Sequence, residues 1–378
     1  VSMNDSQSIS IVYVIDYLFS VNGGTERQLH RLIRGMVERG HTVRLYVFRH
    51  TEFTRNLESF ECPVKSLEID SLISLRGIKR LREFRHMLEH EGVNVVHGFF
   101  NDVALVFPVL FLKSTLRVFT SRRDMGIWYT TPKLILLRMF FWSNARIICN
   151  CEAVADLATS REWKPRKKID VIYNGIDKYY QKADEQKPDV LADSLKETDG
   201  KIRAVLIANV RPIKKISDLI AAAAIMKRND VHFFIIGHIS DADYYGDLSS
   251  QIDKLGLNRY FHFVGSILEP RDILKYFDVG VLCSESEGLS NTVMEYLDSG
   301  LATVISNVGG NRELVEHGVN GFLYEAGNTR ELSDFMLTLI DDSDLRSHFS
   351  IKSKYMMAEL SVARMIESHI RIYRNCLG

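Results

Sequence analysis

The sequence predicts an α/β protein that contains two domains, each built on a parallel sheet. Runs of buried strand character alternate with helical patterns along almost the whole chain. The alternation stops once, in the polar stretch 178–200, and starts again at residue 202. The chain has 378 residues, which is too long for one ordinary core and fits two domains of under about 200 residues each.

The first half begins with a βαβ pattern. Residues 9–15 (ISIVYVI) form a continuous β-branched run, as expected of a strand that is buried on both faces. A helical pattern follows and ends at Gly40, and residues 41–47 form the next strand. The same alternation predicts strands at 93–97, 116–120, 145–150 and 169–172, with helices near 76–91, 102–112 and 132–143.

Residues 178–200 are rich in Lys, Asp and Glu, and we predict the interdomain linker there. After it, an Ala-rich helix at 216–227 accompanies strands at 202–208, 231–236, 260–264, 278–283 and 301–305. Two doubly wound sheets joined by one linker predict a central cleft that the two domains face, since ligands of open α/β sheets bind at the carboxyl ends of the strands.

The formal net charge is zero, which argues against a protein that coats nucleic acid. The charge is nevertheless divided unevenly. Residues 1–177 hold 25 Lys and Arg against 19 Asp and Glu, whereas the remainder holds 23 against 29. This asymmetry predicts an anionic partner for the first half only.

The composition indicates a cytoplasmic protein. Its five cysteines form no CxxC pair and no disulfide spacing pattern, so they read as reduced thiols. No apolar run reaches the roughly 20 residues of a membrane span, and the beginning of the sequence lacks a signal-peptide pattern. Peripheral contact with the inner face of the cytoplasmic membrane is compatible with this composition.

The strongest chemical signal is the segment 284–295, which follows a predicted strand and opens a helix. Ser290 or Asn291 is the predicted N-cap. The free N–H groups and positive dipole end of such a helix favour a phosphate, which would bind at Ser290, Asn291 and Thr292.

Two glutamates accompany this helix. Glu287 lies in the preceding loop and Glu295 lies inside the helix. Carboxylates that reach one cleft can hold sugar hydroxyls. Taken alone, the pair is more simply read as a helix cap and a solvated surface acid.

The stretch from Ser284 to Gly300 resembles the signature of the family 4 glycosyltransferases of the GT-B fold. The stretch begins with Ser284 and contains Glu287-Gly288, and seven residues separate Glu287 from Glu295. It ends with a small residue followed by Gly300. The match continues through 301–305, 308–313 and 318–323. Weaker matches follow in the right order along almost the whole chain.

The resemblance implies two Rossmann-like domains. Residues 1–180 would form an acceptor-side domain, and residues 181–361 would bind the nucleotide sugar. The segment 362–378 would cross back to pack on the first domain. In this family Glu295 would hold the ribose, and Glu287 the sugar hydroxyls near the anomeric carbon.

A basic loop, Arg211-Pro212-Ile213-Lys214, resembles the loop that holds the diphosphate in this family. Arg and Lys at a strand end can neutralise a diphosphate. Many members of the family have Gly-Arg where this chain has Ala208-Asn209. Lys214 therefore matches the family's lysine directly, whereas the arginine is displaced to position 211. We interpret Lys215 as a solvated surface charge.

The first domain contributes two further motifs. Gly23 and Gly24 resemble the glycine loop that approaches the donor phosphates, where positive φ and close backbone contact are expected. His97 ends a strand where the family often places a functional histidine, although the second histidine of its His-x-His pattern is Phe99 here. His97 is therefore either catalytic or a satisfied strand-end histidine.

Two motifs are interpreted as structural. Residues 174–177 (NGID) match a motif near the family's hinge. Asp241-Ala242-Asp243 is a DxD, but it does not follow its strand directly, and we interpret it as a surface loop. We therefore predict no metal and no other cofactor, because cationic side chains and a helix N-terminus would bind the diphosphate.

Cations and aromatics are interleaved between residues 122 and 146, which suits a membrane interface as well as it suits a core helix with a solvated face. Arg122 and Arg123 are candidate acceptor-binding residues. A basic first domain would hold the enzyme near anionic phospholipids or a phosphate-bearing acceptor.

Together these features imply a retaining, metal-independent glycosyltransferase with a nucleotide-sugar donor, UDP-linked by preference. Its acceptor would be a glycan or a lipid-linked glycan of cell-surface polysaccharide or lipopolysaccharide synthesis. The alternatives are a nucleotide-sugar 2-epimerase on the same fold and a non-catalytic sugar-nucleotide-binding protein. A dinucleotide-dependent oxidoreductase is disfavoured, because the first strand–helix turn lacks GxGxxG.

Overall fold

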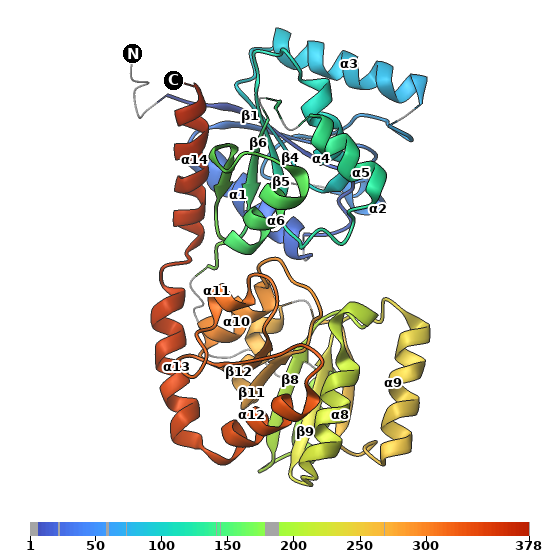
Figure 1. The fold of residues 1–378 in the computed structure, drawn as a ribbon, viewed down its shortest axis with the longest axis vertical. Helices are drawn as coiled ribbons and strands as arrows, with labels where there is room; N and C mark the ends of the chain where they lie inside the picture. Colours follow the sequence, from blue (N-terminus) through green and yellow to red (C-terminus); the bar gives the residue numbers. More distant parts are fainter. Residues whose placement is uncertain are drawn as a thin grey trace. The chain divides into compact units, whose positions relative to one another are not determined.

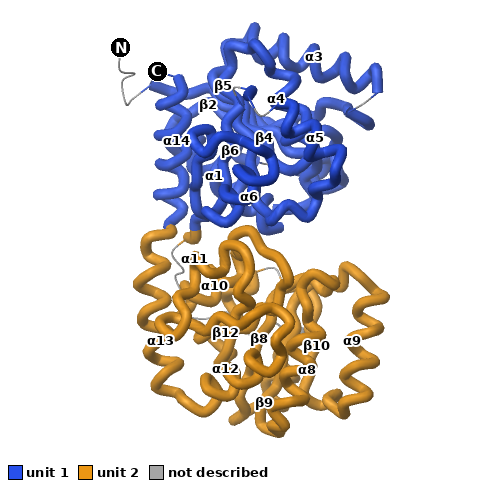
Figure 2. Tube along the Cα trace, viewed as in Figure 1, with its two compact units in different colours: residues 1–175, 361–378 blue, residues 176–360 orange. Residues whose placement is uncertain are grey.

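The computed structural model divides the chain into two compact units, which Figure 2 shows in different colours. Unit 1 comprises residues 1–175 and 361–378, and unit 2 comprises residues 176–360. The structure describes residues 7–21, 23–57, 60–72, 74–140, 142–143, 145–177, 189–267 and 269–377.

Unit 1 is built on a seven-stranded parallel sheet in the order β3-β2-β1-β4-β5-β6-β7. Figure 1 shows this sheet with β1, β4, β5 and β6 labelled. The strand order reverses at β1, which pairs with β2 on one side and β4 on the other. Its strands are β1 (Ser10–Ile15), β2 (Thr42–Val47), β3 (Val64–Ser66), β4 (Val95–Gly98), β5 (Arg117–Arg122), β6 (Arg146–Cys149) and β7 (Ile169–Val171). Its helices are α1 (Gly24–Glu38), α2 (Glu52–Arg55), α3 (Leu75–His90), α4 (Asn101–Leu110), α5 (Thr131–Met139), α6 (Glu152–Glu162), the 3-10 turn η1 (Arg166–Lys168) and α14 (Val362–Leu377).

Unit 2 is built on a six-stranded parallel sheet in the order β10-β9-β8-β11-β12-β13. The prediction of two parallel sheets is confirmed. The strands are β8 (Ile202–Ile207), β9 (Val231–Ile236), β10 (Phe261–Gly265), β11 (Val279–Leu282), β12 (Ala302–Ser306) and β13 (Phe322–Tyr324). The helical elements are α7 (Asp189–Glu197), η2 (Pro212–Lys214), α8 (Ile216–Met226), α9 (Ala242–Leu255), η3 (Pro270–Tyr276), α10 (Asn291–Ser299), α11 (Asn311–Leu314), α12 (Thr329–Asp341) and α13 (Ser343–Met357).

Part of the predicted linker is a helix. Residues 178–188 lie outside the described part of the chain, but residues 189–197 form α7. Leu191 and Leu195, four residues apart on one helix face, are both buried. Most residues of this segment are polar, and its apolar stripe is narrow, so its composition resembles that of a linker. The prediction of a linker through residue 200 was wrong.

The C-terminal helix α14 completes the core of unit 1. Its buried face carries Met365, Ile366, Ile370 and Tyr373, which pack in one cluster with side chains of β1 and α1. The spacing of these residues is that of an amphipathic helix. Gly35 of α1 permits the close approach, because a Cβ there would lie 2.0 Å from Ile366 Cδ1. In the described part of the chain, no helix is long and apolar enough to cross a bilayer.

Candidate functional site

The two loops that carry the predicted diphosphate and sugar residues meet at the carboxyl ends of β8 and β11 in unit 2. The backbone N–H of Glu285 donates to the carbonyl oxygen of Ile213 at 2.9 Å, which joins the loop before α10 to η2. Lys214 Nζ then lies 2.5 Å from Glu287 Oε1. The structure thus brings Lys214 and Glu287, which are far apart in the sequence, into direct contact.

Glu287 is also held by a second partner. The hydroxyl of Ser284, itself fully buried, donates to Glu287 Oε1 at 2.6 Å. The side chains of Lys214 and Glu287 keep 15% and 14% of their surface exposed, so both heads remain accessible from outside. Glu287 is therefore not the cap of α10. Its carboxylate is fixed in place and can accept hydrogen bonds from a ligand.

The two cations near Lys214, namely Arg211 and Lys215, have different surroundings from it. Arg211 is exposed and has no ion pair within the described residues. Lys215 Nζ lies 3.5 Å from Glu285 Oε2 in a pair whose side chains are 42% and 63% exposed. Arg211 is thus available to a ligand, and Lys215 occupies the surface position that the sequence suggested.

The N-terminus of α10 is fixed to the adjacent strand β8. Ser290 is the N-cap, and its Oγ accepts from the Val293 N–H at 3.3 Å. The hydroxyl of Thr292 donates to the Ile207 carbonyl at 3.2 Å, and the Ile207 N–H donates to the Tyr296 hydroxyl at 2.8 Å. The first-turn N–H groups are consequently held at the carboxyl end of the sheet, where an anion would meet them.

Glu295 lies inside α10 and is only 4% exposed. It is therefore not a solvated surface acid. Asn291, the first residue of α10, is partly exposed. The Gly310 N–H donates to the Gly288 carbonyl at 2.8 Å and braces the loop that carries Glu287.

The DxD motif belongs to a helix start. Asp241 is the N-cap of α9, and its Oδ1 accepts from the Tyr244 N–H at 2.9 Å, while Asp243 lies in the first turn. Among the residues that the structure describes, no group of three or more His, Cys, Asp or Glu side chains is arranged to hold a metal ion.

In unit 1, the glycine loop at the start of α1 has a different geometry from the one expected. Gly23 has a φ of −61°, and Gly24 is the first residue of α1, so neither residue uses the left-handed region. A Cβ on Gly23 would lie 2.4 Å from Glu26 Oε2. The glycine thus leaves room for the Glu26 carboxylate, whose pKa is raised because it is largely buried.

His97 is fully buried, and both ring nitrogens are used internally. Nδ1 lies 2.7 Å from the Tyr373 hydroxyl of α14, and Nε2 lies 2.9 Å from Ser121 Oγ of β5. Burial lowers the pKa of this imidazole well below its usual value, so it is held neutral. This is the geometry of a satisfied strand-end histidine, and we assign His97 no chemical step.

The neighbouring arginines at the end of β5 have opposite environments. Arg122 is buried and donates to both carboxylate oxygens of Glu162, from Nε at 2.6 Å and from Nη2 at 2.8 Å. Arg123 is partly exposed and donates from Nη2 to Asn174 Oδ1 at 2.5 Å. Arg122 therefore cannot reach an acceptor without breaking a buried ion pair, and that part of the prediction is corrected. The 174–177 motif has a structural role, since the side chain of Asn174 accepts the hydrogen bond from Arg123.

Sequence reasoning missed a group of residues at the carboxyl end of β1. Asp16 follows the strand directly, and its Oδ2 accepts from the Asp102 N–H at 3.4 Å. Burial, reinforced by the charge of Asp102, raises the pKa of Asp16 to about 7. Tyr17 and Phe19 are exposed and stack with ring centroids 5.9 Å apart. The sequence feature that could have pointed to Asp16 is its position as an acid immediately after a buried β-branched run.

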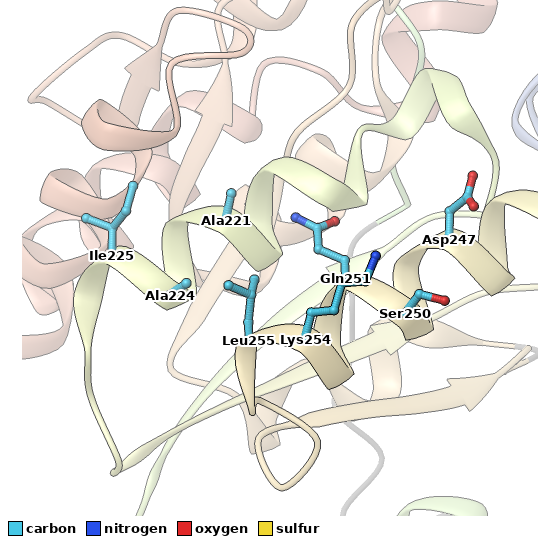
Figure 3. Close-up of a pocket in the computed structure, with 8 residues that line it drawn as sticks. All are labelled: Ala221, Ala224, Ile225, Asp247, Ser250, Gln251, Lys254 and Leu255. Carbon is cyan, nitrogen blue, oxygen red and sulfur yellow. The ribbon is translucent and has the colours of Figure 1, made fainter.

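A surface groove of about 540 Å³ lies elsewhere in unit 2, between α8 and α9 (Figure 3). Its walls include Ala221, Ala224 and Ile225 of α8 and Asp247, Gln251 and Lys254 of α9. None of the candidate site residues lines it, so we assign the groove no part in the chemistry.

Two family descriptions match the chain. "Glycosyltransferase Family 4" matches residues 22–179, and "Glycosyl transferases group 1" matches residues 189–356. An N-acetyl-α-D-glucosaminyl L-malate synthase of Bacillus anthracis is 24% identical, over 93% of this chain and 90% of its own length. A UDP-Gal:α-D-GlcNAc-diphosphoundecaprenol α-1,3-galactosyltransferase of Escherichia coli is 27% identical, over 60% and 58%. The crystal structure of Anabaena Alr3699/HepE in complex with UDP superposes with a TM-score of 0.83 at 19% identity, over 96% of this chain and 99% of that one.

Proposed function

The chain belongs to the family 4 glycosyltransferases and has the GT-B fold, and on this premise we propose that it transfers a sugar, with retention of anomeric configuration, from a UDP-sugar to an anionic cell-surface acceptor. The observation that carries the proposal is the contact between Lys214 and Glu287 at the N-terminus of α10. In this proposal Lys214 would meet the diphosphate, and the neighbouring Glu287 would meet the sugar.

Donor binding would use three charge-bearing groups of unit 2. Lys214, the exposed Arg211 and the first-turn N–H groups of α10 would stabilise the diphosphate without a metal ion. Glu287 would accept from sugar hydroxyls, and Glu295 would hold the ribose. Solved relatives in complex with UDP and with UDP-glucose support the choice of UDP.

In the proposed reaction, the bond between the anomeric carbon and the leaving phosphate oxygen breaks. The acceptor oxygen bonds the same face of that carbon, and its proton passes to the leaving phosphate. Negative charge grows on the diphosphate as the bond breaks, so Lys214 and the helix N-terminus stabilise the transition state more than the ground state. The contribution of the protein is charge stabilisation and positioning.

The acceptor is proposed to carry acidic groups. The relatives' names specify L-malate and a diphosphoundecaprenol-linked sugar, and both of these acceptors are anionic. The surplus of Lys and Arg in residues 1–177 fits such an acceptor, since opposite charge raises its local concentration. Synthesis of a cell-surface polysaccharide or lipopolysaccharide is the setting we propose.

Addition of a UDP-sugar at about 100 times its Kd is expected to raise the Tm of the donor-binding unit by about 5–10 °C, because a ligand that binds only the folded state stabilises it. The measurement is a thermal-shift screen of nucleotide sugars, with and without excess chelator. Lys214→Ala is expected to lose most of the shift, and the matched surface variant Lys215→Ala to keep it. A wild-type shift that vanishes in chelator would contradict the metal-free proposal, and an undiminished shift in Lys214→Ala would contradict the site.

We further propose that unit 1 contacts an anionic bilayer through a surface next to α5. This α5 face consists of Ile135 and Met139, one turn apart on α5, together with the adjoining Trp142, each more than half exposed. The Trp142 indole N–H is already satisfied by the Met139 carbonyl at 3.0 Å, which suits a ring at a membrane interface. Lys168 lies beside the face, since its Nζ donates to the Trp142 carbonyl, and it supplies charge complementary to anionic lipid.

The double variant Ile135→Asp/Met139→Asp is expected to reduce partition onto vesicles that contain anionic phospholipid by about tenfold or more, because two apolar side chains no longer enter the interface. Vesicle flotation measures this effect. The matched control is Leu75→Asp, which alters an exposed leucine at the start of α3, outside the face. Equal flotation of the double variant and the control would argue against membrane contact through α5.

A further inference from the structure

Arg123 directly follows β5, at the carboxyl end of that strand. Within the described residues, no Asp or Glu carboxylate lies at ion-pair distance from its guanidinium. Its contacts are the amide oxygen of Asn174 and the ring of Phe99, whose centroid lies 5.6 Å from Arg123 Cζ. Arg122, one residue earlier, has both oxygens of Glu162. Arg122 is therefore committed to a buried ion pair, whereas Arg123 is partly exposed and can donate to a ligand.

The surroundings stabilise this charge incompletely. Burial lowers the pKa of Arg123 to about 10, because removal from water disfavours the charged form. A neutral amide and an aromatic face offset part of the desolvation. An oxyanion would offset more, because a guanidinium binds two oxygens through parallel N–H groups.

The guanidinium is also held in a fixed place. Asn174 is only 3% exposed, and Phe99 follows the adjacent strand β4. Arg123 therefore lies between segments that follow β4, β5 and β7, at the edge of a parallel sheet where ligands bind. A side chain fixed before the ligand arrives loses little entropy on binding.

We infer that Arg123 binds an oxyanion of the acceptor, a phosphate or a carboxylate, and that Arg122 has only a structural role. The inference rests on the proposed function, in which unit 1 takes an anionic acceptor.

The test is a titration with inorganic phosphate and with malonate in a Lys214→Ala background, which weakens anion binding at the donor site. Arg123→Gln is expected to weaken the binding of the preferred anion by about tenfold or more, the typical loss of a charge-assisted hydrogen-bonded pair. The anion affinity of Arg123→Lys is expected to lie between that of Arg123→Gln and that of the parent, because lysine keeps the charge but lacks the planar guanidinium.

The matched control is Arg117→Gln, which removes an exposed arginine at the opposite end of β5. It is expected to bind both anions as the Lys214→Ala parent does. Vesicles with phosphatidate provide a second arm. If Arg123→Gln loses affinity for the soluble anions, the oxyanion belongs to a soluble acceptor. If it loses affinity only for the vesicles, the oxyanion belongs to a lipid-borne acceptor. Arg123→Gln that binds every probe as tightly as its parent would overturn the inference.

Thermal stability and UDP binding distinguish a ligand-binding Arg123 from a structural one. A merely structural arginine would lower the Tm when replaced, whereas removal of an uncompensated cation is expected to leave the Tm of Arg123→Gln unchanged or raised. UDP is expected to stabilise Arg123→Gln and the wild type equally. Failure of UDP to bind either protein would contradict the proposed function, and the anion titration would still decide the role of Arg123.

Discussion

Glu287→Ala is expected to lower sugar transfer by about 10²–10³-fold, the usual cost of removing one transition-state contact. The carboxylate is fixed by Lys214 and Ser284, so it is ready to accept from sugar hydroxyls without reorganisation. Its removal also frees the Lys214 ammonium. UDP affinity is therefore expected to stay the same or increase while kcat falls. Steady-state kinetics together with UDP titration measure both effects.

Glu285→Ala is the matched control for this prediction. Glu285 lies on the same loop, but it is exposed and pairs with the surface residue Lys215. We expect its transfer rate to stay within about threefold of wild type, as for a solvated surface pair. Thermal unfolding of both variants excludes loss of the fold as the cause. A Glu287→Ala enzyme as active as Glu285→Ala would contradict the site assignment.

Glu162→Ala is expected to reduce the free energy of unfolding of unit 1 by about 3–5 kcal/mol, the typical cost of removing one partner of a buried ion pair. Arg122 and Glu162 are 4% and 3% exposed, and the Tyr129 hydroxyl donates to the same carboxylate. The substitution leaves a buried guanidinium without its counter-charge. Urea unfolding, followed by a signal of unit 1, measures the loss.

Glu152→Ala provides the comparison on the same helix. Glu152 of α6 pairs with Arg166 at 2.7 Å, but the two side chains are 51% and 47% exposed. Its removal is expected to cost only about 0–1 kcal/mol. The double variant Arg122→Met/Glu162→Leu is expected to recover much of the lost stability, since a buried pair can be replaced by packed apolar groups. Similar losses for Glu162→Ala and Glu152→Ala would show that burial does not determine the cost.

Several features of the site were predictable because they are local in sequence. The residue types at the start of α10 predict an N-cap at Ser290 or Asn291, and the structure shows that it is Ser290. The two sheets follow from buried strand runs and their spacing. Arg122 and Arg123 could not be separated in this way. Successive strand residues point to opposite faces, but only tertiary packing decides which face holds Glu162.

Other errors came from patterns that are weak by nature. Helix α7 has only a narrow apolar stripe within a polar segment, so its composition resembled that of a linker. The glycine at position 23 leaves room for the return of Glu26 onto the loop, which residue type does not reveal. The environment of His97 depends on Tyr373, which lies on the C-terminal helix at the far end of the chain.

The sequence by itself determined the fold class, the two-sheet organisation and the family, because periodicity, residue type and motif spacing are properties of neighbouring residues. Only the tertiary structure decided that Lys214 meets Glu287, that His97 is buried in the core, and that Arg122 lies in a buried ion pair while Arg123 stays partly exposed. These outcomes depend on burial and on partners distant in the chain. The free energy of a charge is set by those surroundings, and they exist only once the chain has folded.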